Sequence, residues 1–187
     1  MEFKDKFLFK KVLVLIICLI ALCPIVIVKA AELENSEVDF QEMVTEEQKA
    51  AIETQLDDLD KEIEMIAKVI YRECRSAKIP KEQKAAVVWC ILNRVDSAQY
   101  PGSIKEVITQ SNQFAWVSKT PVRKEFAELA RDVLARWLLE KEGIELVGRT
   151  LPKEYLFFAA HNGRNRFRTK YSGGRYWNWS LPNPYEK

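Results

Sequence analysis

The sequence has little cysteine. Four cysteines occur in 187 residues, and two of them, Cys18 and Cys23, lie in the first thirty residues, which have the character of an export signal. Cys74 and Cys90 remain, each inside an apolar helical pattern that fits a buried free thiol as well as a disulfide. So low a count excludes a scaffold built on disulfides.

The sequence also lacks internal repeats and the composition of a disordered chain. Its hydrophobic content is 48% and it contains five Trp, which is enough to build a substantial core. The length allows one domain of ordinary size together with additional segments.

The N-terminus has the layout of a secretory signal. Four lysines precede an uncharged apolar run from Val12 to Val28, and small residues follow at Ala30 and Ala31. A run of this length is also at the short limit for a membrane span, so residues 1–30 are either a signal peptide or an N-terminal anchor. In both cases we expect a secreted or extracytoplasmic protein that meets a membrane only through this segment.

Charge is divided unevenly along the chain. Residues 31–65 carry two lysines and thirteen acids, whereas residues 66–187 carry 22 Lys and Arg against twelve acids. A basic exported domain suits an anionic surface or polymer outside the cell. Nucleic acid is a poor candidate because an exported protein does not meet it.

Residues 31–59 are predicted to be an acidic linker with a possible helix. A capping box at Thr45–Gln48 starts a pattern of apolar residues at helical spacing. They are Ile52, Leu56, Leu59, Ile63, Ile66 and Ile70. This seam indicates either a short coiled coil or helices that pack on their own domain, with a break near Asp57–Asp60, and we expect the folded domain to cover residues 60–187.

Further helices are predicted after Pro80, after Ser103 and from Thr120–Pro121 to a stop at Gly143. Beyond Gly148 the sequence becomes aromatic and irregular, which is typical of loops and short strands. The predicted fold class is mainly α (α+β).

Glu73 stands out in the stretch "VIYRECRS". Its helical period places it on the stripe of Ile63, Ile66 and Ile70, so its carboxyl group is predicted to face the core. Burial would raise the pKa of this carboxyl and suit it to act as a general acid. The ordinary alternative is a salt bridge with one of its basic neighbours, which are Lys68, Arg72, Arg75 and Lys84.

Three ordered motifs surround Glu73: "AKVIYRECRS", "EQKAAVVWCILNRVDS" and "YPGSIKEVITQSNQFAWV". Together they make residues 62–117 resemble the SleB-like, spore cortex-lytic cell wall hydrolases. The resemblance implies a lysozyme-like fold and cleavage of peptidoglycan glycan strands, in many members as a lytic transglycosylase at the MurNAc-β-1,4-GlcNAc bond. It implies that Glu73 is the catalytic acid, although Cys74 replaces the usual Ala and the part after Tyr155 matches loosely.

The resemblance places Gln113 and Phe114 in a "Q-F" turn that lines the cleft, and aromatic residues such as Trp116 and Tyr155 are suited to stack on sugars or to fill the core. Asn93 is suited to bind a sugar or, as the alternative, to cap a helix or link to a turn. The expected substrate-binding residues are Tyr71, Asn93, Gln113, Phe114, Trp116, Tyr155, His161 and Asn162.

A transglycosylase needs one carboxylate and neither a metal nor a cofactor. A two-carboxylate hydrolase would need a second acid, for which Asp96 is the best candidate, without any motif around it. The expected partners are peptidoglycan strands and an accessory cell wall or germination protein, because no separate wall-binding module is recognisable, and a monomer is expected.

Two other functions fit parts of the sequence. A membrane-tethered, non-catalytic wall-binding or coiled-coil adaptor would use the apolar N-terminus, the seam and the basic domain. A cysteine peptidase would pair His161 with Cys74 or Cys90, but neither cysteine begins a helix as an activated thiol would. The run Arg164, Arg166, Arg168 and Lys170 suits wall carboxylates or, by default, a solvated loop.

Overall fold

The computed structural model describes residues 44–161 and 164–186. The signal or anchor predicted for residues 1–30, and Asn162 among the expected site residues, lie outside this part. Within the described residues no helix has the length and apolar character needed to cross a membrane.

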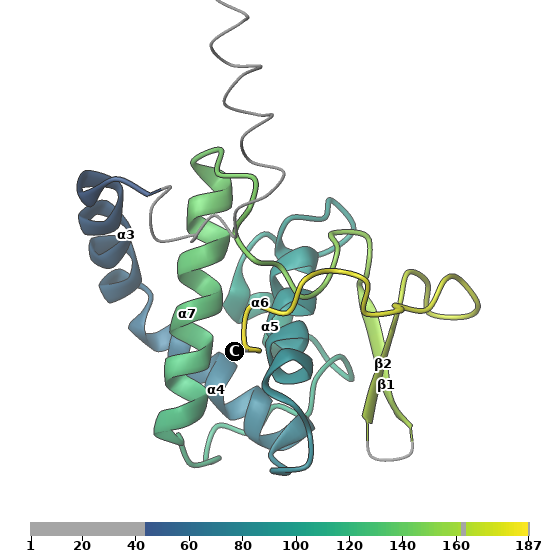
Figure 1. Cartoon of the computed structure of the whole chain (residues 1–187). Coiled ribbons are helices and arrows are strands. Elements are labelled where there is room, and N and C mark those ends of the chain that lie inside the picture. The colour runs from purple at the N-terminus through teal and green to yellow at the C-terminus, as the bar shows by residue number, and fades with distance from the viewer. Residues whose placement is uncertain (1–43, 162–163, 187) are drawn as a thin grey trace, which may run out of the picture. The chain divides into compact units, whose positions relative to one another are not determined.

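The described chain is mainly helical, as predicted from the sequence (Figure 1). Five helices are followed by one antiparallel hairpin, in which Phe157 pairs with Arg168 and His161 with Arg164. The elements are α3 (Glu46–Asp58), α4 (Asp60–Cys74), α5 (Lys81–Val95), α6 (Ile104–Thr109), α7 (Lys124–Lys141), β1 (Phe157–His161) and β2 (Arg164–Arg168).

Helix α5 forms the centre of the core. Every residue from Ala85 to Leu92 is fully buried, including Trp89. A helix that is apolar on all sides must be surrounded by other elements, and α5 contacts α4, α6, α7 and β1. The residues that follow this buried stretch, Asn93 and Arg94, therefore bring polar groups into the interior.

Helices α3 and α4 both pack on α7, and the predicted seam is buried except at Leu59, which is half-buried. The break comes at Leu59, and Thr45 makes the predicted capping box with Gln48. Across the contact, Arg131 of α7 lies 2.7 Å from both Glu53 and Asp57. The seam thus packs within its own chain in this structure.

The compact unit begins at Val44. Helix α3, which the sequence analysis assigns to the linker of residues 31–59, therefore belongs to the folded body, and the expected boundary near Asp60 falls between two packed helices. The acidic composition of this stretch belongs to a mostly exposed helix, in which only Ile52 and Leu56 are buried.

Helix starts were predicted correctly at Pro80 and Ser103, which are the N-caps of α5 and α6. The start of α7 was predicted too early. The N–H of Thr120 donates to the carbonyl of Val117 over 3.0 Å, so Thr120–Pro121 belongs to the preceding turn and Arg123 is the N-cap. The helix stops as predicted before Gly143, whose φ of +89° suits glycine.

The C-terminal segment runs back over the helical body after the hairpin (Figure 1). The indole N–H of Trp177 donates to the carbonyl of Thr150 over 3.0 Å. Near the end, the Tyr185 hydroxyl donates to Asp132 of α7 over 2.7 Å. Burial beside this carboxylate raises the pKa of Tyr185 well above its usual range, so the hydroxyl remains a donor.

Candidate active site

Glu73 lies in the last turn of α4, where the helix leaves the core. Ile66, Ala67 and Ile70 before it are fully buried, but Glu73 itself is half-exposed. Its Oε1 accepts a 2.7 Å hydrogen bond from the backbone N–H of Ala115. The prediction of a carboxyl group facing the core is therefore corrected: the helix ends one residue later, at Cys74, and Glu73 stands at the edge of the core.

The alternative interpretation of Glu73, a salt bridge with a basic neighbour, is not seen within the described residues. Three of the four basic neighbours lie beside aromatic rings instead: Lys68 is 5.8 Å from the centre of the Trp116 ring, Arg75 is 5.4 Å from that of Tyr71, and Lys84 is 5.6 Å from that of Phe126. No Lys or Arg of residues 44–161 or 164–186 lies within ion-pair distance of the carboxylate. The carboxylate is held by a neutral donor, so its charge is not cancelled by a cation.

The turn that carries Ala115 is the predicted "Q-F" turn. Asn112 begins it with a φ of +59°, which asparagine tolerates better than most residues. Gln113 and Phe114 are half-buried and Ala115 is exposed. The structure therefore brings this turn to Glu73 through its backbone.

Arg94 of α5 holds the same turn from inside, and the sequence analysis did not single it out. Arg94 is 3% exposed. Nη1 donates to the side-chain oxygen of Gln113 over 3.0 Å, and Nε donates to the carbonyl of Leu156 over 2.7 Å. The guanidinium also lies 4.8 Å from the centre of the Phe114 ring. The signal that could have identified Arg94 is a charged residue inside the apolar run "CILNRV".

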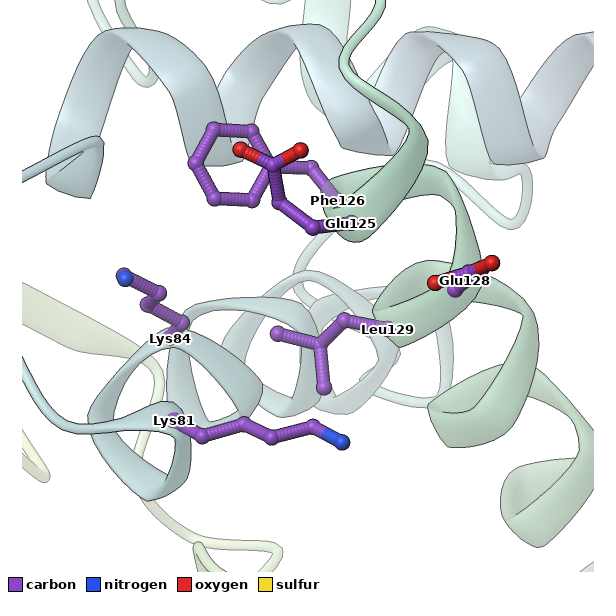
Figure 2. Close-up of a pocket in the computed structure, with 6 residues that line it drawn as sticks. All are labelled: Lys81, Lys84, Glu125, Phe126, Glu128 and Leu129. Carbon is purple, nitrogen blue, oxygen red and sulfur yellow. The ribbon is translucent and has the colours of Figure 1, made fainter. Parts of the chain in front are cut away.

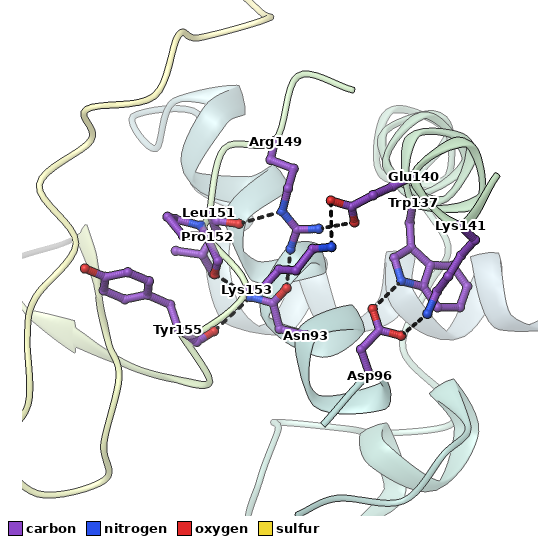
Figure 3. Close-up of polar contacts among 10 residues, drawn as sticks. All are labelled: Asn93, Asp96, Trp137, Glu140, Lys141, Arg149, Leu151, Pro152, Lys153 and Tyr155. Carbon is purple, nitrogen blue, oxygen red and sulfur yellow. Dashed lines mark hydrogen bonds and ion pairs between the residues drawn. The ribbon is translucent and has the colours of Figure 1, made fainter. Parts of the chain in front are cut away.

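Asn93 makes structural contacts on another side of α5 (Figure 3). Its amide donates to the carbonyls of Pro152 and Tyr155 over 2.8 and 3.1 Å, and its oxygen accepts from Arg149. With 3% exposure and both amide hydrogens engaged, the side chain presents no free donor to a sugar. The geometry is that of the alternative reading, a link from the helix to the neighbouring turn.

Arg149 anchors this buried network. It donates to Glu140 over 2.6 Å and lies 4.0 Å from the centre of the Trp89 ring. Burial lowers the pKa of Arg149, and the nearby Glu140 carboxylate opposes that effect. The network joins α5, α7 and the segment before β1.

Asp96, the candidate second acid, is also engaged. Its carboxylate accepts from the indole N–H of Trp137 over 2.8 Å and pairs with Lys141 (Figure 3). Both partners are on α7, so Asp96 joins the ends of two helices.

The expected aromatic residues have different surroundings. Tyr71, on the same helix as Glu73, packs edge-on against Phe126 at 6.3 Å between ring centres. Trp116 is half-buried in the turn beside Glu73, and Phe114 contacts Phe158 of β1 at 6.1 Å. Tyr155 is 5% exposed and packs against Trp177, as a core residue does.

His161 is exposed at the end of β1, in the last pair of the hairpin. Within the described residues, the His161 side chain makes no hydrogen bond or ion pair. Arg166 and Arg168 of the predicted basic run lie over the rings of Tyr176 and Tyr171 at 4.3 and 5.7 Å. The basic run is thus partly covered by aromatic rings.

Cys74 and Cys90 are free and buried. Burial raises the pKa of each thiol to about 12, so both are protonated at neutral pH. A cysteine nucleophile needs a low pKa and access to solvent, and these thiols have neither. This geometry speaks against the cysteine peptidase. Within the described residues, no group of three or more His, Cys, Asp or Glu side chains is arranged to hold a metal ion.

Comparison with known protein families gives a match. A protein-family model described as Cell Wall Hydrolase matches residues 78–175, which is just over half of the chain. The match includes Arg94 and the turn of Gln113 and Ala115, and it begins after Glu73. No curated protein and no solved structure matches.

Proposed function

Because the chain belongs to the cell wall hydrolase family and so acts on peptidoglycan, we propose that it cleaves the MurNAc-β-1,4-GlcNAc bond as a lytic transglycosylase with Glu73 as the catalytic acid. The substrate is the glycan strand of the wall or of the spore cortex. We propose with it that the protein acts outside the cytoplasm as a monomer, directed by an accessory cell wall or germination protein.

One observation carries the proposal: Glu73 is a half-exposed carboxylate held by a backbone N–H. The bond from Ala115 fixes Oε1 and leaves Oε2 without a protein partner in the described part of the chain. A catalytic carboxyl group needs this combination of a fixed position and an oxygen open to the substrate.

The reaction uses Glu73 twice. As an acid it gives its proton to the glycosidic oxygen while the bond from that oxygen to C1 of the muramyl sugar breaks. As a carboxylate it then takes the proton of the C6 hydroxyl of the same sugar, and O6 bonds to C1. The products are a free 4-hydroxyl and a 1,6-anhydro end, and Glu73 is again protonated.

A single-carboxylate reaction is also supported by the surroundings of the other candidate acid. Asp96 is occupied by Trp137 and Lys141. A hydrolase that uses two carboxylates needs a free second one about 5–9.5 Å from the first.

Clearing of purified cell walls by the full-length chain tests the proposal. Wild-type protein is expected to clear the suspension and release fragments with anhydromuramyl ends, and Glu73→Gln is expected to fold but not clear it. Glu62→Gln is the matched control, because Glu62 is another half-exposed glutamate on α4 and is expected to stay fully active.

Each other outcome has a clear meaning. If Glu73→Gln clears walls, Glu73 is not the acid. Reducing ends without anhydro ends would replace the transglycosylase by a hydrolase. If wild type and Glu73→Gln bind walls equally and neither clears them, the protein is the non-catalytic adaptor.

A further inference from the structure

A pocket of about 320 Å³ lies between the start of α5 and the start of α7 (Figure 2). The apolar side chains of Phe126 and Leu129 form its floor, and these residues are 4% and 3% exposed. Two lysines of α5 and two glutamates of α7 complete the lining. These four residues are Lys81, Lys84, Glu125 and Glu128.

The charges of the pocket do not neutralise one another. Lys84 and Lys81 lie over the rings of Phe126 and Tyr185, at 5.6 and 4.7 Å from the ring centres. Within the described residues, neither lysine pairs with a carboxylate and Glu125 pairs with no cation. Glu128 is different, since it lies 3.6 Å from Lys124, outside the pocket. Two ammonium groups and one carboxylate thus remain available around an apolar floor.

The pocket borders the end of α4 that carries Glu73. Phe126 of its floor packs edge-on against Tyr71, two residues before Glu73. The ammonium group of Lys84 acts electrostatically on the Cys74 thiol, the next residue after Glu73. The sequence neighbours of Glu73, Tyr71 and Cys74, thus interact with lining residues of the pocket.

We propose that this pocket binds the diamino acid end of a peptidoglycan stem peptide, where an ammonium and a carboxylate share one carbon. The ligand carboxylate meets Lys84 and Lys81, its ammonium meets Glu125, and its methylene chain covers Phe126 and Leu129. This inference rests on the proposed function, because the stem peptide hangs from the muramyl sugar whose bond Glu73 cleaves.

The chemistry favours a zwitterion over a simple anion. An anion would meet Lys84 and Lys81 but would also face the unpaired carboxylate of Glu125, which repels it. A ligand with both charges pairs with the two lysines of α5 and with Glu125 of α7. Charge-assisted hydrogen bonds of this kind are among the stronger polar contacts.

Isothermal titration of the full-length chain in mild detergent with the tripeptide L-alanyl-γ-D-glutamyl-meso-diaminopimelate tests the assignment. Lys84→Gln and Glu125→Gln are each expected to weaken binding about tenfold, the usual effect of losing one charged hydrogen bond. Lys105→Gln is the matched control, an exposed lysine of α6 outside the pocket, and is expected to bind as wild type does.

Two further ligands test the chemistry. The same tripeptide with its diaminopimelate amine acetylated is expected to bind about tenfold more weakly to wild type, and equally to wild type and Glu125→Gln. Free diaminopimelate, which carries the same zwitterionic end, is expected to compete with the tripeptide for the pocket. If it does not compete, the pocket does not bind the diamino acid end and the stem-peptide assignment is wrong.

Glu73→Gln separates this inference from the proposed function. It is expected to bind the tripeptide as wild type does while failing to clear walls. If it clears walls and the pocket variants lose binding, the proposed function fails alone. If Glu73 is needed for clearing but Lys84→Gln and Glu125→Gln bind the tripeptide normally, the pocket assignment fails alone.

Discussion

The backbone N–H of Ala115 donates a 2.7 Å hydrogen bond to Oε1 of Glu73, across 42 positions of sequence. The bond joins the last turn of α4 to the turn after α6. It fixes one carboxylate oxygen and thereby sets the direction of the other. The length of the glutamate side chain therefore determines where its second oxygen, Oε2, lies in the candidate site.

Shortening this side chain tests the role of its reach. Glu73→Asp keeps the charge but withdraws the carboxylate by about 1.5 Å, the length of one carbon–carbon bond. We expect the Ala115 contact to be lost and wall clearing to fall roughly 100-fold, because small displacements of a catalytic group are costly. The rate of turbidity loss measures this effect. Full activity of Glu73→Asp would contradict it.

Gln113 is expected to matter through Arg94. Gln113→Leu leaves the buried Nη1 of Arg94 without its acceptor, so the free energy of unfolding should fall by about 1–3 kcal/mol in urea denaturation. Clearing per folded molecule should also fall, because the turn carries Ala115.

Gln113→Glu is the conservative control for this prediction. It retains an acceptor for Arg94 and should restore both stability and activity. If Gln113→Leu is as stable and active as wild type, or Gln113→Glu behaves no better than Gln113→Leu, Arg94 does not position the turn through Gln113.

Asn93 is expected to be a stability residue. Asn93→Leu leaves the carbonyl of Tyr155 and one donor of Arg149 without partners and removes one of the two hydrogen bonds to the carbonyl of Pro152, which should lower the free energy of unfolding by about 1–3 kcal/mol. The half-saturating wall concentration of the folded protein should be unchanged. A higher half-saturating concentration without loss of stability would instead support sugar binding by Asn93.

The raised pKa values of the two cysteines predict that the free energy of unfolding depends on pH. Burial raises the pKa of Cys74 and Cys90 to about 12, whereas an unfolded thiol titrates near 8.5. As the pH rises, the unfolded chain loses these protons first, so their stabilising contribution is complete below about pH 8.5 and is lost up to about pH 12. Unfolding of Cys90→Ala should therefore depend less steeply on pH in this window.

The same burial predicts slow alkylation. Iodoacetamide at pH 8 should leave both thiols of the folded protein unmodified by mass analysis, and should label both after unfolding in urea. Rapid labelling of the folded protein with loss of activity would favour the cysteine peptidase.

The sequence predicted those parts of the fold that depend on local chemistry. Thr45, Pro80 and Ser103 start helices because their own backbone or side-chain groups suit that position. Thr120–Pro121 has the same local character, but the Thr120 N–H donates to Val117 in the preceding turn and Thr120 is buried, so the helix begins later, after Arg123.

The candidate site was only partly predictable. Helical periodicity identified the buried stripe of α4, but it did not show that Glu73 leaves the core at the end of the helix. Arg94 and Asn93 are adjacent in sequence and both bind carbonyls of residues 152–156, but only Arg94 also reaches the Q-F turn, since successive residues on a helix point in different directions. Which of the two reaches the site depends on tertiary packing, because each binds a carbonyl that lies 62 positions further along the chain.

The hydrogen bond that holds Glu73 comes from the main chain, so no side-chain motif in the sequence identifies its donor. Every amino acid except proline carries the N–H that Ala115 donates, and the Ala115 side chain is exposed. The residue type at position 115 can therefore vary, provided that the backbone of the turn keeps its conformation. A saturation library at this codon, selected for wall clearing, should lose proline and retain the other residues.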